Sequence, residues 1–318
     1  MMKKLLIVVV FALSLSAAAQ LPLGSVGNVQ PTLCPTGFVT GAACSTATVS
    51  CPDEPDIQIT FGTYGKPTNG TVILLNGNGG TVPAGSGVAS AYKKAGLSLI
   101  QFVFATFWEY GNGNLKQAAC RPATVFNHFY NPDVPYAAQV TSAGSGAMGY
   151  ALAWYGMAHE FKNVELLVGP VFSNIKLGCE VPEASAITII PTDGASFTDS
   201  PLYDNEYTFL TKIFGVACLP TTDTPPTHNA LWASQSIISA GAIVSYPTTR
   251  LAAWGCNNGL NPSSAQSYLF LSEVKTPWTF TAITDCDGAE GVESGKTPDG
   301  VVGLTAIEED MISAMTPK

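Results

Sequence analysis

The 318-residue sequence predicts an α/β fold in which a mostly parallel central sheet carries helices on both faces and a lid-like insertion. Two observations predict it. Over residues 56–170 and again over 228–315, short strand-like runs alternate with helix-like segments, which is the order of a parallel sheet with crossover helices. Between them, residues 173–226 break this rhythm and are rich in Pro, Thr and Asp, so we interpret them as an insertion over the sheet.

The N-terminal 20 residues, "MMKKLLIVVVFALSLSAAAQ", have the pattern of a secretory signal peptide. Lys3 and Lys4 precede a short apolar run, and the small residues Ala17 and Ala19 follow it. The apolar run is short for a membrane span. We therefore expect residues 1–19 to be removed, a mature chain beginning near Gln20, and a secreted or periplasmic location.

Residues 20–55 are rich in Gly, Pro, Thr and Cys without a sustained period, and we expect an irregular segment there before one domain over residues 56–318. The alternating run "DIQITFGTY" predicts the first strand, and "TVILLNGNGG" predicts a buried strand that ends in a tight turn. Later strands are expected at residues 97–107, 136–142, 163–170, 248–255 and 278–285. Helices are expected at residues 87–96, 119–130, 145–161, 228–242, 263–274 and 303–315.

The formal net charge is −9, and loss of Lys3 and Lys4 with the signal makes the mature chain more acidic. An acidic chain is a poor partner for nucleic acid or for anionic membrane surfaces. The sequence has no Cys-x-x-Cys motif or histidine cluster, so we expect neither a metal site nor a cofactor.

All eight cysteines follow the signal peptide, and an even number in an exported chain predicts disulfides. Cys256 and Cys286 follow two adjacent late strands, which makes them the first expected pair. Cys179 and Cys218 would form the second pair and close the insertion as a loop.

The stretch "QVTSAGSGAMGYAL", residues 139–152, joins a strand to a helix through small residues, and "LLNGNGG" follows an early strand. With the order of strands and helices, these motifs resemble the α/β-hydrolase superfamily over roughly residues 57–315. Members of this superfamily carry a nucleophile on a sharp strand-to-helix turn, where small residues allow the chain to fold tightly. The resemblance implies a serine hydrolase that acts on a small-molecule carboxylic ester.

Two registers of this turn are open. In the first choice Ser142 is the nucleophile, although Val140 stands where the family usually has Gly. In the alternative, Ser145 is the nucleophile between Ala143 and Ala147. A third reading makes both serines helix caps. In the first register the oxyanion donors would be the amide of Ala143 and an amide of Gly77 or Asn78.

The remaining members of the triad are missing. The family carries its acid after the strand expected at residues 248–255, where this chain has Asn257, and its histidine after the last strand, where it has Glu290. No histidine follows His228, which could reach the serine only from a lid. His128 and His159 are expected to be structural. Two functions stay open: an ester hydrolase with an unusual base, and a catalytically degenerate binding or surface protein. We expect weak or absent turnover of simple esters, because a serine without a base is a poor nucleophile.

Overall fold

The computed structural model describes residues 20–85, 87–180, 186–201, 207–216, 218, 226–257, 264–286 and 291–316. The expected signal peptide and Glu290 lie outside these residues. Among the described residues, no helix has both the length and the apolar character needed to cross a membrane.

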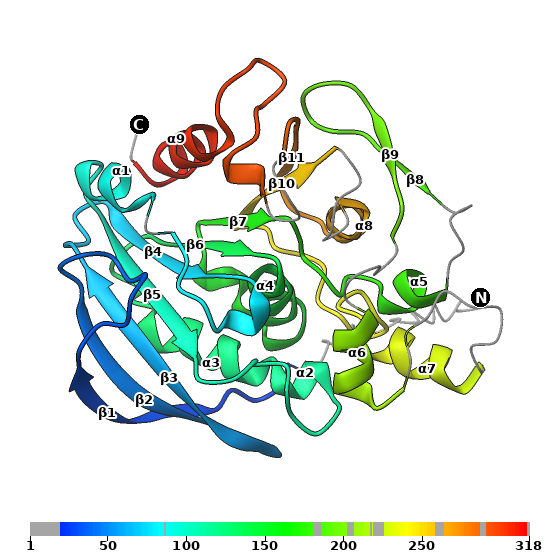
Figure 1. The fold of residues 1–318 in the computed structure, drawn as a ribbon, viewed down its shortest axis with the longest axis horizontal. Coiled ribbons are helices and arrows are strands. Elements are labelled where there is room, and N and C mark those ends of the chain that lie inside the picture. The colour runs from blue at the N-terminus through cyan, green and yellow to red at the C-terminus, as the bar shows by residue number, and fades with distance from the viewer. Residues whose placement is uncertain are drawn as a thin grey trace, which may run out of the picture.

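The described residues form a nine-stranded sheet in the order β1-β2-β3-β5-β4-β6-β7-β10-β11 (Figure 1). All pairs from β5 to β11 are parallel, and the pairs from β1 to β5 are antiparallel. The strands are β1 (Ser25–Thr32), β2 (Ala43–Cys51), β3 (Glu54–Tyr64), β4 (Gly70–Leu75), β5 (Leu97–Phe104), β6 (Tyr136–Thr141), β7 (Asn163–Leu167), β10 (Arg250–Cys256) and β11 (Trp278–Ile283). The predicted fold class, a mostly parallel sheet with crossover helices, is confirmed.

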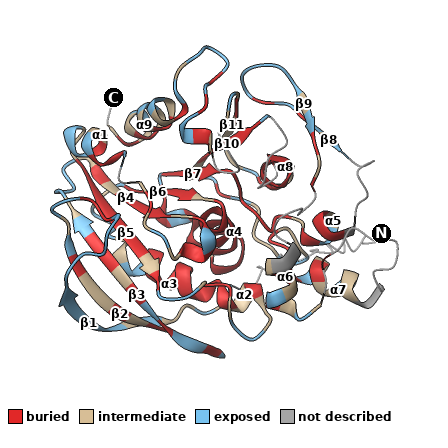
Figure 2. Ribbon diagram, viewed as in Figure 1, coloured by how far each residue is buried: buried red, intermediate tan, exposed pale blue. Residues whose placement is uncertain are grey.

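Helices cover both faces of the sheet (Figure 1). The helices are α1 (Ala89–Lys94), α2 (Leu115–Ala118), α3 (Cys120–Phe129), α4 (Ala143–Tyr155), α5 (Ile175–Glu180), α6 (Tyr207–Phe214), α7 (Pro226–Gln235), α8 (Ser264–Glu273) and α9 (Gly303–Met315). Residues of α3 and α4 belong to one large apolar core, and residues of α1 and α9 belong to a second. In β6, Ala138 and Val140 face the first core and Ala137 faces the second, as the two-residue period of a strand requires. Figure 2 shows the buried residues concentrated in β4, β6, β7 and α4.

The prediction that residues 20–55 are irregular is wrong, because β1 and β2 lie there. The strand β2 reads "ACSTATVSC", and its inward residues Ala47 and Val49 are buried. Because these side chains are small, the alternation of apolar and polar residues is weak in the sequence. The packing of helix α3 on β2 is still enough to bury them. The edge strand β1 is mostly exposed and its pairing with β2 shifts between Gly27 and Gln30, where Asn28 has a φ of +53°.

No described strand of residues 173–226 joins the central sheet. This insertion contributes α5, α6 and a separate two-stranded sheet of β8 (Ile187–Ile189) and β9 (Phe197–Asp199). Between β8 and β9, Asp193 forms an isolated parallel bridge with Thr281 in β11, the outermost strand of the central sheet. The insertion therefore packs against the edge of the sheet that β11 forms.

Four disulfides are present: Cys34–Cys44, Cys51–Cys120, Cys179–Cys218 and Cys256–Cys286. The expected pairs Cys179–Cys218 and Cys256–Cys286 are both confirmed. Four disulfides are typical of an oxidising, extracytoplasmic environment.

Candidate active site

The turn between β6 and α4 is sharp and strained. Ser142 stands between the last residue of the strand and the first of the helix with φ +51° and ψ −119°, a conformation that a residue with a β-carbon rarely adopts. Its backbone N–H donates to the carbonyl of Leu167 in β7 over 2.9 Å, and its carbonyl accepts from the N–H of Gly146 over 3.0 Å. These bonds hold the strained residue in place, with its side chain at the carboxyl edge of the sheet.

The small residues of the turn have a steric reason. A β-carbon on Gly144 would lie 2.5 Å from the carbonyl oxygen of Leu75 and 2.8 Å from that of Asn76. Only glycine therefore lets the first turn of α4 approach the end of β4. This approach brings the "NGNGG" segment beside Ser142.

Ser145 is placed differently. Its side chain has no exposed surface, and its hydroxyl donates to the carbonyl oxygen of Ser142 over 2.5 Å. A β-carbon on Gly169 would lie 1.7 Å from its Oγ, so the hydroxyl is closed in from that side. Ser142 is 6% exposed. Of the two serines, Ser142 therefore has the strained backbone of the strand-to-helix turn, and Ser145 lies in the first turn of α4 with its hydroxyl bonded back to Ser142.

The segment after β4 presents backbone amides next to the turn. It forms a short 3-10 helix, η1 (Asn78–Gly80), which packs against α4, and Asn78 has a φ of +51°. The first N–H groups of a helix have no partner within it, which applies to Ala143 in α4 and to Asn78 in η1. The N–H of Gly77 donates instead to Oδ1 of Asn76 over 2.8 Å. Of the expected oxyanion donors, the geometry favours Ala143 and Asn78 over Gly77.

None of the three histidines hydrogen-bonds to Ser142 among the described residues. His128 is exposed on α3. His159 follows the far end of α4, a 13-residue helix roughly 20 Å long, and its Nδ1 contacts the carbonyl of Gly156 over 2.9 Å. His228 is half-buried on α7, with its ring 5.9 Å from that of Trp232. The role of His228 as a base therefore stays a prediction.

The usual place of the acid is occupied by a structural residue. Asn257 is exposed directly after β10, and its N–H donates to the carbonyl of Ile283 at the end of β11 over 3.0 Å. The disulfide Cys256–Cys286 joins the same two strand ends, with Cα atoms 6.1 Å apart. The other displaced position, Glu290, lies outside the described residues.

A polar cavity of about 270 Å³ opens beside the nucleophile turn. It lies between the end of β4, the segment before α1, the end of β6, and the short helix η4 (Gly291–Glu293) that follows β11. Its lining residues are Asn76, Pro83, Ala84, Gly85, Gly87, Gln139, Thr141 and Glu293. Sequence reasoning missed Glu293, because no local pattern marks a residue that only the fold brings to the same cavity as Thr141, the neighbour of Ser142.

Buried polar groups continue inward from this cavity. The hydroxyl of Tyr92 in α1 donates to Oε1 of Gln139 over 2.5 Å, and Glu165 lies beside Gln139 on the next strand. Burial raises the pKa of the Glu165 carboxyl well above its ordinary value; the nearby Asp310 raises it further, and Arg250 opposes the shift. Neither carboxyl oxygen of Glu165 has a hydrogen-bond partner among the described residues. The sheet thus holds an acid group whose ionisation folding disfavours.

This carboxyl predicts a pH dependence of stability. Because its pKa is higher in the folded chain than the ordinary value of about 4.3, the unfolded chain loses this proton first as the pH rises, and the folded state then loses stability. Glu165→Gln removes that loss, so its Tm relative to the wild type should rise between pH 4 and pH 8. Thermal unfolding across this range measures it, with the exposed Glu273→Gln as the matched control. An equal Tm difference at every pH would contradict the expectation.

An aromatic cluster connects the insertion to the same site. The ring of Phe107 lies against Gly79 in η1, and its centroid is 5.6 Å from that of Phe209 in the insertion helix α6. Phe209 also stacks on Phe172, with 6.3 Å between centroids, and a β-carbon on Gly146 in the first turn of α4 would lie 2.9 Å from the ring of Phe172. The insertion therefore contributes an apolar wall next to the nucleophile turn and the oxyanion segment.

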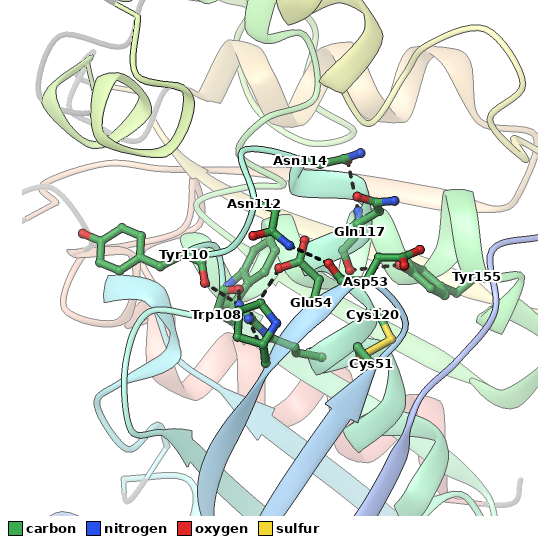
Figure 3. Close-up of polar contacts among 12 residues, drawn as sticks. Cys51, Asp53, Glu54, Trp108, Tyr110, Asn112, Asn114, Gln117, Cys120 and Tyr155 are labelled. Atoms are coloured by element: carbon green, nitrogen blue, oxygen red, sulfur yellow. Dashed lines mark hydrogen bonds and ion pairs between the residues drawn. A yellow bond between two sulfur atoms is a disulfide. The ribbon is translucent and has the colours of Figure 1, made fainter.

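The loop that carries Phe107 is fixed by a buried cation. The guanidinium of Arg121 in α3 donates to the carbonyls of Trp108, Tyr110 and Pro55 over 2.9, 2.6 and 2.8 Å. It also pairs with the buried carboxylate of Glu54 at 3.5 Å. Figure 3 shows Glu54, Trp108 and the nearby Cys51–Cys120 disulfide. The N–H of Trp108 donates to the carbonyl of Gly79 over 3.1 Å, so Arg121 indirectly fixes the position of η1.

Neither a protein-family model nor a curated protein sequence matches the chain. Its fold is similar to that of a solved acetyl xylan esterase 1 from Thermoanaerobacterium sp. JW/SL YS485, with a TM-score of 0.55 and 10% identity over 94% of this chain and 92% of that one. A carboxyl esterase from Bacillus coagulans gives a TM-score of 0.47 and 13% identity over 85% of this chain and 97% of that one, which is too low to add to the argument. At such identities the likeness concerns the fold and not the reaction. The order of the strands, the helices on both faces and the similarity to the first structure together give this chain the fold of the α/β-hydrolase superfamily.

Proposed function

We propose that the chain is a secreted hydrolase of carboxylic esters in which Ser142 is the nucleophile. The observation that carries this proposal is the positive φ of Ser142 at the junction of β6 and α4. Strain of this kind persists where the surrounding structure enforces it, and it is common at catalytic turns. Four disulfides support an extracytoplasmic location, and a signal peptide over residues 1–19 would direct the chain there.

The surroundings of Ser142 suit an ester. The amides of Ala143 and Asn78 would donate to the negative oxygen that forms when the hydroxyl attacks a carbonyl carbon. Phe107, Phe172 and Phe209 would contact an apolar part of the substrate. The insertion, with α6 above this wall, would act as a lid. No residue in this set requires a metal or a cofactor for the reaction.

A second function has its own support. None of the described histidines bonds to Ser142, and Asn257 stands where an acid would orient a histidine. A chain that lost its base would keep the fold, the cavity and the aromatic wall, and it would bind a small ligand without turning it over. Under this alternative the strained turn persists because the packing of Gly144 requires it.

Labelling by a fluorophosphonate probe and hydrolysis of p-nitrophenyl acetate distinguish the two functions. Ser142→Ala should abolish labelling and reduce turnover to the background rate, because the attacking oxygen is gone. Ser145→Ala is the matched control on the same turn and should keep labelling, since its hydroxyl is enclosed. His228→Ala tests the lid base. Labelling that survives Ser142→Ala, or that is absent from the wild type, would contradict the proposed nucleophile.

A further inference from the structure

The helix η4 brings an acidic side chain to the place that a histidine usually occupies in this fold. It follows β11 directly, precedes α9, and packs against both α9 and β10. Its last residue, Glu293, is exposed and lines the 270 Å³ cavity together with Asn76 and Thr141. Thr141 precedes Ser142 in the chain, and Asn76 precedes the oxyanion segment. Glu293 therefore borders the same open cavity as the residue that precedes Ser142 and the residue that precedes the "NGNGG" turn's amides.

The other residues that line this cavity are amides, a hydroxyl and apolar groups, so Glu293 is its only titratable lining residue among those described. Tyr92 lies behind Gln139, and burial raises the pKa of its hydroxyl well above the ordinary value, with Glu165 adding to the shift. Tyr92 therefore stays protonated. Of the described residues that line this cavity, Glu293 is therefore the one whose side chain suits a proton acceptor.

We propose that Glu293 is the proton acceptor for Ser142. This inference rests on the proposed function. As Oγ of Ser142 bonds to the ester carbonyl carbon, its proton passes to a carboxylate oxygen of Glu293. The carbon–alkoxy bond then breaks and the proton passes from Glu293 to the leaving alcohol. A water molecule repeats the sequence on the acyl-serine, which releases the carboxylic acid and restores both side chains. A carboxylate is a weaker base than imidazole, so turnover by this route should be slow.

Other charges surround this carboxylate. Among the described residues, the titratable side chains on the elements around η4 and on its own loop are Tyr92, Glu165, Arg250, Asp285, Lys296, Asp299, Glu308, Glu309 and Asp310. A substitution at position 293 leaves all of them unchanged. The comparison of variants at this one position therefore isolates the base from its surroundings.

The test measures kcat/KM for p-nitrophenyl acetate and the rate of fluorophosphonate labelling on the full chain. Glu293→Gln, which keeps the shape and removes the base, should lower both by about 10²–10⁴-fold. The exposed Glu273→Gln at the end of α8 is the matched control and should leave both unchanged. Circular dichroism verifies that each variant is folded.

The pH profile supplies a readout that a structural role would not change. A carboxylate base should keep kcat/KM within about twofold between pH 7.5 and pH 5, whereas in Glu293→His the ratio should fall about 30-fold over this range, because an imidazole is mostly protonated at pH 5.

Three results would overturn the inference. If Ser142→Ala abolishes labelling while Glu293→Gln stays within about threefold of the wild type, the nucleophile stands and the base is wrong. If Glu293→His keeps the profile of the wild type, position 293 does not handle the proton. If the wild type shows neither labelling nor turnover, the base and the proposed function both fail.

Discussion

Replacing Arg121 by methionine is expected to lower the free energy of unfolding by about 3–5 kcal/mol. The guanidinium holds three backbone carbonyls and the Glu54 carboxylate, and both side chains of the ion pair are buried. Burial lowers the pKa of Arg121, and the neighbouring carboxylates of Glu54 and Glu109 oppose that shift. Without the cation, Glu54 would remain in the interior as a carboxylate with no ion pair. Denaturant unfolding at pH 7 measures the loss.

Arg250 provides the matched control for this substitution. It pairs with Asp310 at 2.6 Å, a shorter distance than at Arg121, but the two side chains are 31% and 26% exposed. Water partly screens this pair, so Arg250→Met should cost less than Arg121→Met, although it also removes the hydrogen bonds to Asn163 and Thr279. The double variant Arg121→Met/Glu54→Gln should recover part of the stability, because it removes the stranded charge as well. Equal losses at the two arginines would show that burial does not decide the effect.

Removing the Cys51–Cys120 disulfide is expected to lower the free energy of unfolding by about 4 kcal/mol, from the chain entropy that the bond removes from the unfolded state. The bond spans 69 residues and ties the end of β2 to the start of α3, next to Arg121. Both disulfides are removed by replacing their two cysteines with serine. For Cys34–Cys44, whose cysteines are 10 residues apart, the expected loss of unfolding free energy is about 3 kcal/mol.

Denaturant unfolding of the two double variants under non-reducing conditions gives both values. The two losses should differ by more than the entropic values if removing Cys51–Cys120 also loosens the contacts of Arg121 with Glu54 and the three carbonyls. Cys120 directly precedes Arg121 in helix α3. A smaller loss for the longer loop would contradict the entropic account.

The sequence predicted the turn at Ser142 because every requirement of that turn is local. A strand, a knot of small residues and an apolar helix follow one another within residues 139–152, and the chain has to bend sharply where they meet. The disulfide pairs Cys179–Cys218 and Cys256–Cys286 were also predictable, since each closes a segment that the strand order already defined.

The parts that were missed depend on contacts between distant segments. The strands β1 and β2 are built from Ala, Ser, Thr and Cys, whose burial only the covering helix α3 makes favourable. Nothing near Glu54 indicates that Arg121 will reach it. For the position after the last strand the sequence pointed to Glu290, which lies outside the described residues. Glu293 was missed because the path of that loop follows from the packing of η4 against α9 and β10.

The two outer strands of the sheet bear on how copies of this chain behave at high concentration. An open strand edge is a template on which another chain can add a strand and begin an aggregate. At one edge, β1 is interrupted by the shifted pairing at Asn28 and carries Pro31, which has no N–H to offer. At the other edge, β11, Asp193 forms a bridge with Thr281. The N–H of Thr192 donates to the carbonyl of Phe280, and the N–H of Phe280 donates to the Thr192 hydroxyl. Both edges of the sheet are therefore poor templates for the addition of a strand from another copy.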